Sequence, residues 1–368
     1  MRIGVNTLYL IPGGVGGTEV YLRCLLNALA EIDSANQYII FTNRETDAAI
    51  APPRANFLVV KQPVRAVVRT ARILWEQAAL PLALARRHVD VLLNPGFTSP
   101  VLCPCPAVTV FHDLQHKRHP ENFRRFDLPF WRLLLWAAAH RSRLLVAVSE
   151  ATRADLLRYY NISESKIRVV PHGVEEQFFE MGHERRQIQP QRYLLAVSTL
   201  HPHKNLERLV RVFAKFRQPR PDFRLVIAGL RGFATVELER LITDLGLEGA
   251  VHLTGWIPRD ELVDLYLHAW ACVNPTLFEG FGMPVLEALA AGIPTACSSI
   301  EPLKSIAGEA ALLFDPTSDQ ALLDALTRVA SDDDLRSRLA AAGPARASQF
   351  SWRKAAEATL GVLVQAAR

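Results

Sequence analysis

Short apolar segments alternate with amphipathic helical patterns along most of the chain. Apolar runs typical of buried strands occupy residues 3–8, 38–41, 57–60, 89–93, 107–111, 144–148 and 167–170. Helical patterns such as residues 19–30 and 152–160 fall between several of them. Consecutive parallel strands require a crossover, usually helical, and strands covered on both faces are apolar throughout. The alternation therefore predicts a parallel, doubly wound α/β sheet in the first half.

A polar stretch at residues 174–190, rich in Glu, Gln and Arg, interrupts this alternation and predicts an interdomain linker. Strands are then expected at residues 193–197, 223–228, 251–254, 271–274, 295–297 and 311–314, with helices at 205–216, 235–245, 259–269, 284–291, 318–330, 332–342 and from Trp352. A chain of 368 residues fits two domains. We predict two Rossmann-like domains, residues 1–180 and 181–350, that face each other across a cleft. Ligands in such sheets bind at the carboxyl ends of the strands.

The composition excludes several classes of protein. Hydrophobic residues make up 49% of the chain, yet no run approaches the roughly 20 apolar residues of a membrane-spanning helix. A strand-like segment follows directly on Met1 and Arg2, so we expect no signal peptide. The five cysteines, including Cys103 and Cys105, lack the spacing of redox or zinc pairs and are expected to be reduced thiols. These features predict a cytoplasmic protein.

Positive charge is concentrated in the first half. Residues 1–180 carry 21 Lys and Arg against 16 Asp and Glu, whereas the remainder carries 21 of each. One expected basic face comprises Arg65, Arg69 and Arg72, with Arg86 and Arg87 close behind. A second group comprises Lys117, Arg118, Arg124, Arg125, Arg132, Arg141 and Arg143, interleaved with Phe123, Phe126, Phe130, Trp131 and Trp136.

This mixture of basic and aromatic residues favours contact with a lipid-linked phosphate or an anionic membrane surface, which for a cytoplasmic protein would be the cytoplasmic face of the inner membrane. The surface residues expected to make it are Arg65, Arg69, Arg72, Arg118, Arg124 and Arg125. The alternative is an ordinary solvated face whose aromatic side chains turn inward. No nucleic-acid recognition motif is present, so nucleic acid is not expected as a partner.

Residues 279–287 read Glu-Gly-Phe-Gly-Met-Pro-Val-Leu-Glu and follow an expected strand. Pro284 suits the first turn of a helix, because its missing N–H would have no partner there in any case. The amides of the turn from Gly280 to Met283 would then point toward a ligand, supported by the helix dipole. Glu279 precedes the helix and Glu287 lies about one turn inside it. The pattern predicts a site for a phosphorylated, hydroxyl-rich molecule with one carboxylate at each end.

A glycine-rich loop, Pro-Gly-Gly-Val-Gly-Gly at residues 12–17, follows the first expected strand and precedes a helix. Its spacing is not that of the dinucleotide fingerprint. Gly16 and Gly17 would let a ligand approach the backbone, although a tight turn without a ligand is the alternative. His112 closes another strand of the first half, and Asp113 either fixes its tautomer or caps the following turn.

The segment Ser-Thr-Leu-His-Pro-His-Lys-Asn, residues 198–205, follows the first strand of the second half. Its place at a strand end before a helix is where a pyrophosphate would bind. Lys204 carries a compact charge and three donors suited to bridging two phosphates.

Taken in order, from about residue 3 to 360, these motifs resemble those of retaining glycosyltransferase family 4, whose members have the GT-B fold. The subgroup they resemble most is the mannosyltransferase-like one of bacterial surface-polysaccharide biosynthesis. The resemblance implies that residues 351–368 form a closing helix that packs back on the first domain. Residues 170–174, Val-Pro-His-Gly-Val, look like the family's hinge, in which His172 would be structural.

The family also implies roles for single residues. His112, Glu279 and Lys204 would be catalytic: His112 would contact the donor sugar, Glu279 would steady positive charge at the anomeric carbon, and Lys204 would bind the diphosphate. Glu287 would accept hydrogen bonds from the ribose. The backbone near Trp256 would border the nucleobase, although Trp256 could equally be core. The full donor-binding set is Gly16, Gly17, Thr199, His203, Lys204, Trp256, Ile257, Glu279, Gly280, Phe281, Gly282, Met283, Leu286 and Glu287.

One departure concerns Thr199, which stands where many members carry a phosphate-clamping arginine. The predicted function is nevertheless that of a retaining hexosyltransferase, with GDP-mannose as the best guess for the donor. The acceptor would be a glycan or a polyprenyl-diphosphate-linked glycan. No cofactor and no metal are expected, because Lys204 and backbone amides would stabilise the leaving diphosphate. The alternatives are a nucleotide-sugar epimerase or hydrolase, or a non-catalytic partner subunit.

Overall fold

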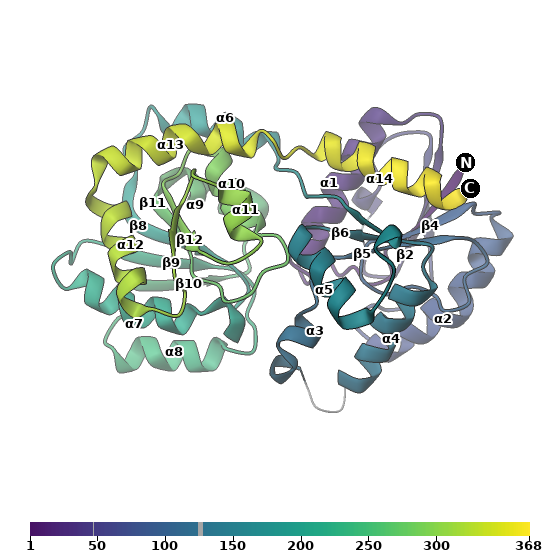
Figure 1. Cartoon of the computed structure of the whole chain (residues 1–368), viewed down its shortest axis with the longest axis horizontal. Helices are drawn as coiled ribbons and strands as arrows, with labels where there is room; N and C mark the ends of the chain where they lie inside the picture. Colours follow the sequence, from purple (N-terminus) through teal and green to yellow (C-terminus); the bar gives the residue numbers. More distant parts are fainter. Residues whose placement is uncertain (47, 124–127) are drawn as a thin grey trace. The chain divides into compact units, whose positions relative to one another are not determined.

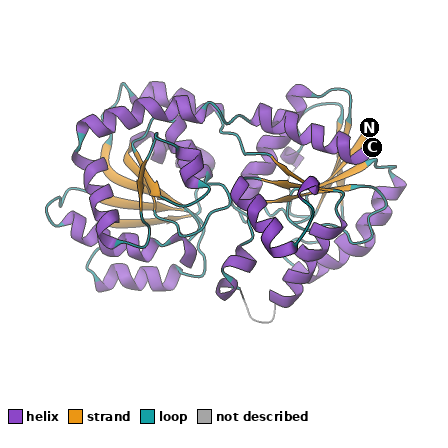
Figure 2. Ribbon diagram, viewed as in Figure 1, coloured by secondary structure: helices purple, strands orange, loops and turns teal. Residues whose placement is uncertain are grey.

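The computed structural model describes residues 1–46, 48–123 and 128–368. The chain forms two compact units, Met1–Gly173 with Ser351–Arg368, and Val174–Phe350 (Figure 1). In each unit helices cover a sheet of parallel strands (Figure 2). The predicted α/β class with two doubly wound parallel sheets is therefore confirmed.

In the described part of the first unit, the sheet has seven parallel strands in the order β3-β2-β1-β4-β5-β6-β7. The strands are β1 (Arg2–Asn6), β2 (Gln37–Thr42), β3 (Phe57–Lys61), β4 (Val91–Asn94), β5 (Ala107–Phe111), β6 (Leu144–Ala147) and β7 (Ile167–Val169). The helices are α1 (Gly17–Ile32), α2 (Arg69–Arg86), α3 (Gln115–Arg118), α4 (Leu128–Arg141), α5 (Glu150–Tyr160) and α14 (Trp352–Ala367), with short 3₁₀ turns η1 (Ala48–Ile50), η2 (Pro120–Asn122) and η3 (Glu164–Lys166). Every residue of β4, β5 and β6 is buried, as expected for strands covered on both faces.

The second unit repeats this plan with six strands, in the order β10-β9-β8-β11-β12-β13 among the residues described. They are β8 (Gln191–Val197), β9 (Arg224–Ala228), β10 (Val251–Gly255), β11 (Ala269–Asn274), β12 (Thr295–Ser298) and β13 (Leu312–Phe314). The helical segments are α6 (Glu176–Arg185), η4 (Pro202–Lys204), α7 (Leu206–Arg217), α8 (Thr235–Asp244), α9 (Arg259–His268), α10 (Met283–Ala290), α11 (Leu303–Ala307), α12 (Asp319–Ser331) and α13 (Asp333–Ala347). The strand order reverses between β8 and β11, and in the first sheet between β1 and β4, which is where doubly wound sheets bind ligands.

The boundary between the units lies at Gly173 and Val174 rather than at the predicted residue 180. The expected linker instead contains α6, which belongs to the second unit. Phe178 of α6 is fully buried there, with its ring 5.4 Å from the ring of Tyr266. The sequence masked this contact because the apolar face of α6 is narrow and its remaining residues are polar.

The chain leaves and re-enters the first unit at one place. The backbone at Gly173 lies so close to the start of α14 that a Cβ atom there would be 2.1 Å from the amide nitrogen of Trp352. From this point α14 packs along α1, and it buries Ala355, Ala356 and Leu363. Only glycine fits at the crossing.

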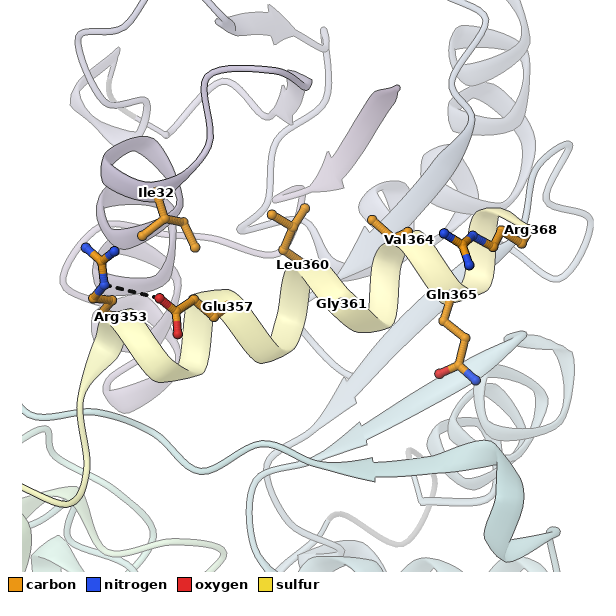
Figure 3. Close-up of a pocket in the computed structure, with 8 residues that line it drawn as sticks. All are labelled: Ile32, Arg353, Glu357, Leu360, Gly361, Val364, Gln365 and Arg368. Atoms are coloured by element: carbon orange, nitrogen blue, oxygen red, sulfur yellow. Dashed lines mark ion pairs between the residues drawn. The ribbon is translucent and has the colours of Figure 1, made fainter.

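A matched pair of glycine substitutions tests this crossing. We expect Gly173→Ala to destabilise the protein by about 2 kcal/mol or more, because the added methyl group overlaps backbone atoms. Gly361→Ala, inside α14, is the control, since Gly361 has open space at its Cβ position and borders a depression of about 520 Å³ lined by residues of α14 and by Ile32 (Figure 3). It should raise stability by about 0.5–1 kcal/mol. Thermal unfolding followed by circular dichroism measures both, and an unchanged melting temperature for Gly173→Ala would contradict the close approach.

Candidate active site

Two loops of the second unit meet beyond the carboxyl ends of β8 and β11. Nζ of Lys204, in η4, lies 2.6 Å from Oε1 of Glu279, in the loop that leads from β11 to α10. The two side chains are largely but not fully buried, at 16% and 12% exposed. The structure thus places the predicted phosphate-binding cation against the predicted catalytic carboxylate.

Hydrogen bonds to backbone carbonyl groups hold these two loops together. Asn205 adopts a left-handed conformation with φ 58°, which a short polar side chain tolerates. Its Nδ2 donates to the carbonyl oxygens of Pro275 (3.0 Å) and Pro316 (2.9 Å). The carbonyl oxygen of His203 accepts from Oγ1 of Thr276 at 3.1 Å. The position of Lys204 beside Glu279 is therefore fixed from both loops.

The glycine turn before α10 needs the backbone freedom of glycine. Gly282 has φ 109°, and a Cβ atom there would lie 2.3 Å from Cδ2 of Leu303. Phe281 is 5% exposed and Leu286 is 1% exposed, so their side chains belong to the core. Their burial agrees with a ligand contact through the backbone amides of the turn, but not with one through the side chains of Phe281 and Leu286.

Glu287 is buried in α10, and protein groups already engage both of its carboxylate oxygens. Nη2 of Arg259 donates to Oε1 at 2.5 Å, and the hydroxyl of Tyr266 donates to Oε2 at 2.9 Å. Nη2 of Arg259 also donates to the carboxylate of Glu175. The sequence analysis anticipated Glu287 but neither Arg259 nor Tyr266. The sequence could predict that a carboxylate on the buried side of a helix needs a partner. It contained no motif that identified Arg259 or Tyr266 as that partner.

The loop after β10 carries Trp256, whose side chain is 57% exposed. A core role for Trp256 is therefore wrong, and its place beside a nucleobase stays a prediction, as does that of Ile257. Thr199 lies in the loop after β8, where its carbonyl oxygen accepts from the amide of His201 at 2.8 Å. His203 is 7% exposed, with its ring 5.8 Å from that of His201. Contacts of Thr199 and His203 with phosphate also remain predictions.

In the first unit, His112 stands at the end of β5 and is 8% exposed. Its Nε2 lies 2.8 Å from the carbonyl oxygen of Pro95. Because a carbonyl oxygen only accepts, Nε2 carries the proton and Nδ1 is left as an acceptor. Asp113 does not fix this tautomer, because its Oδ1 accepts from the amide of Gln115 at 2.9 Å and so caps the turn. Burial lowers the pKa of His112 to about 4, so the ring is neutral near pH 7. Its predicted contact with the donor sugar is still to be tested.

His112 belongs to a cluster of buried rings at the crossing point of the first unit. The ring of Tyr21 lies 4.8 Å from those of His112 and His172, and His172 stacks on Trp352 at 5.7 Å. Burial lowers the pKa of His172 well below its usual value, and the neighbouring His112 lowers it further. This packing agrees with a structural role for His172.

The glycine-rich loop after β1 turns through two left-handed glycines, Gly13 and Gly16, with φ 71° and 60°. The amide of Gly13 donates to Oε2 of Glu19 at 2.8 Å, and Oε1 of Glu19 pairs with Arg23 at 2.9 Å. The loop therefore already receives one carboxylate from its own helix. Gly16 and Gly17 precede and begin α1, so their contact with a donor is still a prediction.

Two family models match consecutive parts of the chain. The model described as Glycosyltransferase Family 4 matches residues 15–178, and that described as Glycosyl transferases group 1 matches residues 180–346. Together they cover nearly the whole chain, in the order in which the motifs occur.

This chain belongs to glycosyltransferase family 4. Membership identifies it as a glycosyltransferase. Similar curated proteins include O-antigen chain mannosyltransferase B of Escherichia coli, 28% identical over 262 residues that cover 69% of each chain. O-antigen chain mannosyltransferase RfbU of Salmonella typhimurium is 28% identical over 63% of each chain. Serotype-specific mannosyltransferase WbdA of Escherichia coli is 26% identical over 68% of this chain and 32% of its own. The chain therefore spans less than two thirds of the length of RfbU and of WbdA.

Solved structures resemble the glycosyltransferase over almost all of its length. Sucrose-phosphate synthase from Thermosynechococcus elongatus matches with a TM-score of 0.80 at 20% identity, over 99% of this chain and 98% of that one. WaaG, a glycosyltransferase involved in lipopolysaccharide biosynthesis, matches with a TM-score of 0.76 at 17% identity, over 99% of both chains. At these identities the likeness shows the fold, and the predicted GT-B architecture is confirmed.

The predicted basic surface of the glycosyltransferase is only partly present. Arg72 is 7% exposed, and its Nη1 lies 3.9 Å from Oε2 of the buried Glu76, so the prediction that it faces solvent is wrong. Arg72 and Glu76 lie on the same buried face of α2 as Leu80 and Leu84. Arg118 is 42% exposed and pairs with Asp155 at 2.7 Å. Arg124, Arg125 and Phe126 lie outside the described residues.

Arg65 is exposed and pairs with Glu45, and the guanidinium of Arg69 lies 4.6 Å from the ring centre of Trp131. The nearby aromatic residues are not all turned inward, because Phe130 is 50% and Trp136 is 48% exposed. The alternative of a face with only inward aromatic side chains is therefore also wrong.

Within the described residues, no group of three or more His, Cys, Asp or Glu could hold a metal ion, and no helix is long and apolar enough to cross a membrane. The five cysteines are free thiols, and the sulfur atoms of Cys103 and Cys105 lie 3.8 Å apart.

The buried histidines predict a pH dependence of stability. Burial lowers the pKa of His112 to about 4 and of His116 to about 3, and that of His172 lies well below its usual value. Below about pH 6.5 the unfolded chain binds protons at these residues and the folded chain does not. The free energy of unfolding should therefore fall as the pH drops from 6.5 to 5, by up to about 1.4 kcal/mol per pH unit for each histidine.

Urea unfolding at several pH values measures this slope. His172→Asn should reduce the slope by about one proton, whatever its effect on stability at pH 7. Replacement of the exposed His183 in the same way is the control for the substitution. Identical slopes for the native protein and His172→Asn would contradict a neutral, buried His172.

Proposed function

We propose that this glycosyltransferase moves a hexose from a nucleoside-diphosphate sugar to a glycan or polyprenyl-diphosphate-linked acceptor, with retention of the anomeric configuration. The observation that carries the proposal is the contact between Lys204 and Glu279 at the switch point of the second sheet. It supplies a cation for the leaving group and an anion for the reacting sugar at one place.

Lys204 suits the leaving diphosphate. One of its three N–H donors is engaged by Glu279, and the others remain for phosphate oxygens. As the bond between sugar and phosphate lengthens, negative charge builds on the diphosphate, and a fixed cation in a partly buried site lowers the barrier. The start of α10 adds the positive end of a helix dipole. On this proposal no divalent metal is required.

Glu279 suits the opposite charge. The anomeric carbon becomes positive as the diphosphate departs, and a carboxylate nearby stabilises it. We favour front-face substitution: the bond from the anomeric carbon to the phosphate oxygen breaks while that to the acceptor oxygen forms. The acceptor's proton passes to the departing phosphate oxygen. Because the acceptor enters on the face that the phosphate leaves, the configuration is retained.

Mannose, carried by GDP, is our proposal for the transferred sugar. The choice of mannose is supported by the mannosyltransferase names of the relatives reported above, and that of GDP by the family resemblance alone. The two O-antigen chain mannosyltransferases among them also support an acceptor in surface-polysaccharide synthesis. A nucleotide-sugar epimerase or hydrolase would instead turn over the donor without any acceptor, and a non-catalytic subunit would not turn it over at all.

The test compares donor binding and turnover in Glu279→Gln and the native enzyme. Thermal shifts with UDP, GDP, ADP and their sugar conjugates, with and without a chelator, select the donor. Glu279→Gln should lower kcat by about 100-fold or more and change nucleotide binding less than about 3-fold, because its charge acts mainly in the transition state. Equal losses in both would refute the role of Glu279. Full turnover without acceptor would favour the hydrolase, and no turnover with any donor would favour the binding subunit.

We further propose that α4 and the start of α2 rest on an anionic membrane. Phe130, Leu133 and Trp136 project from one side of α4 and are 48–60% exposed, while Leu134 and Leu135 face the core. Exposed Val67 and Val68 directly precede α2, and exposed Leu74 lies in its second turn. α2 contacts α4 through Arg69 and Trp131. Apolar side chains beside arginines are what an interfacial helix presents to anionic lipid.

Vesicle sedimentation tests this contact. Leu133→Glu should weaken binding to phosphatidylglycerol vesicles by about tenfold or more, because it removes apolar burial and adds repulsion. Val236→Glu is the matched control, since Val236 is 70% exposed on α8 of the other unit. Equal binding of Leu133→Glu and the native protein, or equal loss in both variants, would contradict the proposal.

A further inference from the structure

Arg259 occupies the junction of three elements of the second unit. It is the first residue of α9, and its Nη2 donates both to Glu287 of α10 and to Glu175, which precedes α6. Its guanidinium lies 4.9 Å from the ring centre of Phe178. Two anions and one aromatic face therefore fix a single cation.

The charges in this cluster are unevenly buried. The side chain of Glu287 is 8% exposed, whereas those of Arg259 and Glu175 are 30% and 26% exposed. A carboxylate as buried as Glu287 is costly unless it is paired and hydrogen-bonded. Burial of Tyr266 raises its pKa well above the usual value, so its hydroxyl is a lasting neutral donor to Glu287. Arg259 supplies the only positive charge that pairs with Glu287 among the described residues.

The geometry leaves Glu287 able to bind more than these partners. Two carboxylate oxygens offer about four lone-pair sites. Arg259 takes one site on Oε1 and Tyr266 one on Oε2, so each oxygen keeps a second site. With both oxygens held from the protein side, the direction of the remaining sites is set in advance.

We propose that Arg259 is a positioning residue of the donor site. Together with Tyr266 it holds the Glu287 carboxylate in the orientation that accepts the ribose hydroxyls of a nucleoside diphosphate. This inference rests on the proposed function and on the contact between Glu287 and the ribose that the family resemblance implies. Glu175 is a second anchor for the same guanidinium nitrogen and so helps to fix the position of Arg259.

Nucleotide binding to Arg259→Ala, Glu287→Ala and the double variant tests the inference. The probes, measured by calorimetry, are GDP, UDP and ADP, and the 2′-deoxy and 3′-deoxy forms of whichever binds the native enzyme. The native enzyme should bind the ribonucleotide about tenfold or more tightly than its deoxy forms. A missing hydroxyl group leaves the buried Glu287 carboxylate without one of its hydrogen-bond donors. Arg259→Ala should weaken ribonucleotide binding by a similar factor and abolish the preference. Arg259→Lys should restore part of it, since a charge returns without the fork.

The double variant separates positioning from direct contact. If Arg259 acts through Glu287, its removal should have no further effect in the Glu287→Ala background. Arg336→Lys is the control for loss of a partly buried guanidinium, because Arg336 donates to the carbonyl oxygens of Trp270 and Val329. Additive losses, or an unchanged ribose preference in Arg259→Ala, would overturn the inference alone. A native enzyme that binds none of the diphosphates and transfers no sugar would overturn the proposed function instead.

Discussion

Parallel pairing is the constraint on which the candidate site depends. In each unit the strands of the sheet run in one direction, so all of their carboxyl ends lie on the same edge. The loops that follow β8 and β11 leave this edge on opposite sides of the point where the strand order reverses, and they meet above it. Lys204 and Glu279 are neighbours for this reason, although 75 residues separate them in the chain. The strands contribute mainly apolar side chains to the core. The candidate site residues Lys204 and Glu279 lie in the loops that the strands position.

The two acidic residues of the glycine turn are held in different ways. Glu279 pairs with a lysine that can exchange this partner for phosphate, whereas Glu287 is fixed by a guanidinium and a phenol in the core of the unit. A partner that can be displaced suits a group that must respond during a reaction. A partner that cannot be displaced suits a group that only recognises. The same residue type, once in the loop before α10 and once inside α10, is thus suited to two purposes by its surroundings.

The sequence supported the architecture and the positions of the main motifs, because both depend on local order. Alternating apolar runs predicted the strands, and Pro284 after a glycine turn predicted the start of α10 to within a residue. Arg72 was misplaced because its spacing from Arg69 suggested one exposed face, while contacts with Glu76 turn that part of α2 inward. Arg259 was missed because its place in the site depends on ion pairs with two carboxylates that lie 28 and 84 residues away in the sequence. Such pairings depend on tertiary packing, which periodicity does not record.

The return of α14 to the first unit has a consequence for biosynthesis. Trp352, Ala355, Ala356, Val362 and Leu363 are buried there against elements made from the opposite end of the chain. Domains usually fold in the order in which they leave the ribosome. Here the first unit lacks α14 until the whole of the second unit, Val174–Phe350, has been translated. While those residues are being made, the nascent first unit exposes the side of α1 that α14 later covers. During that interval a chaperone has an apolar surface to bind.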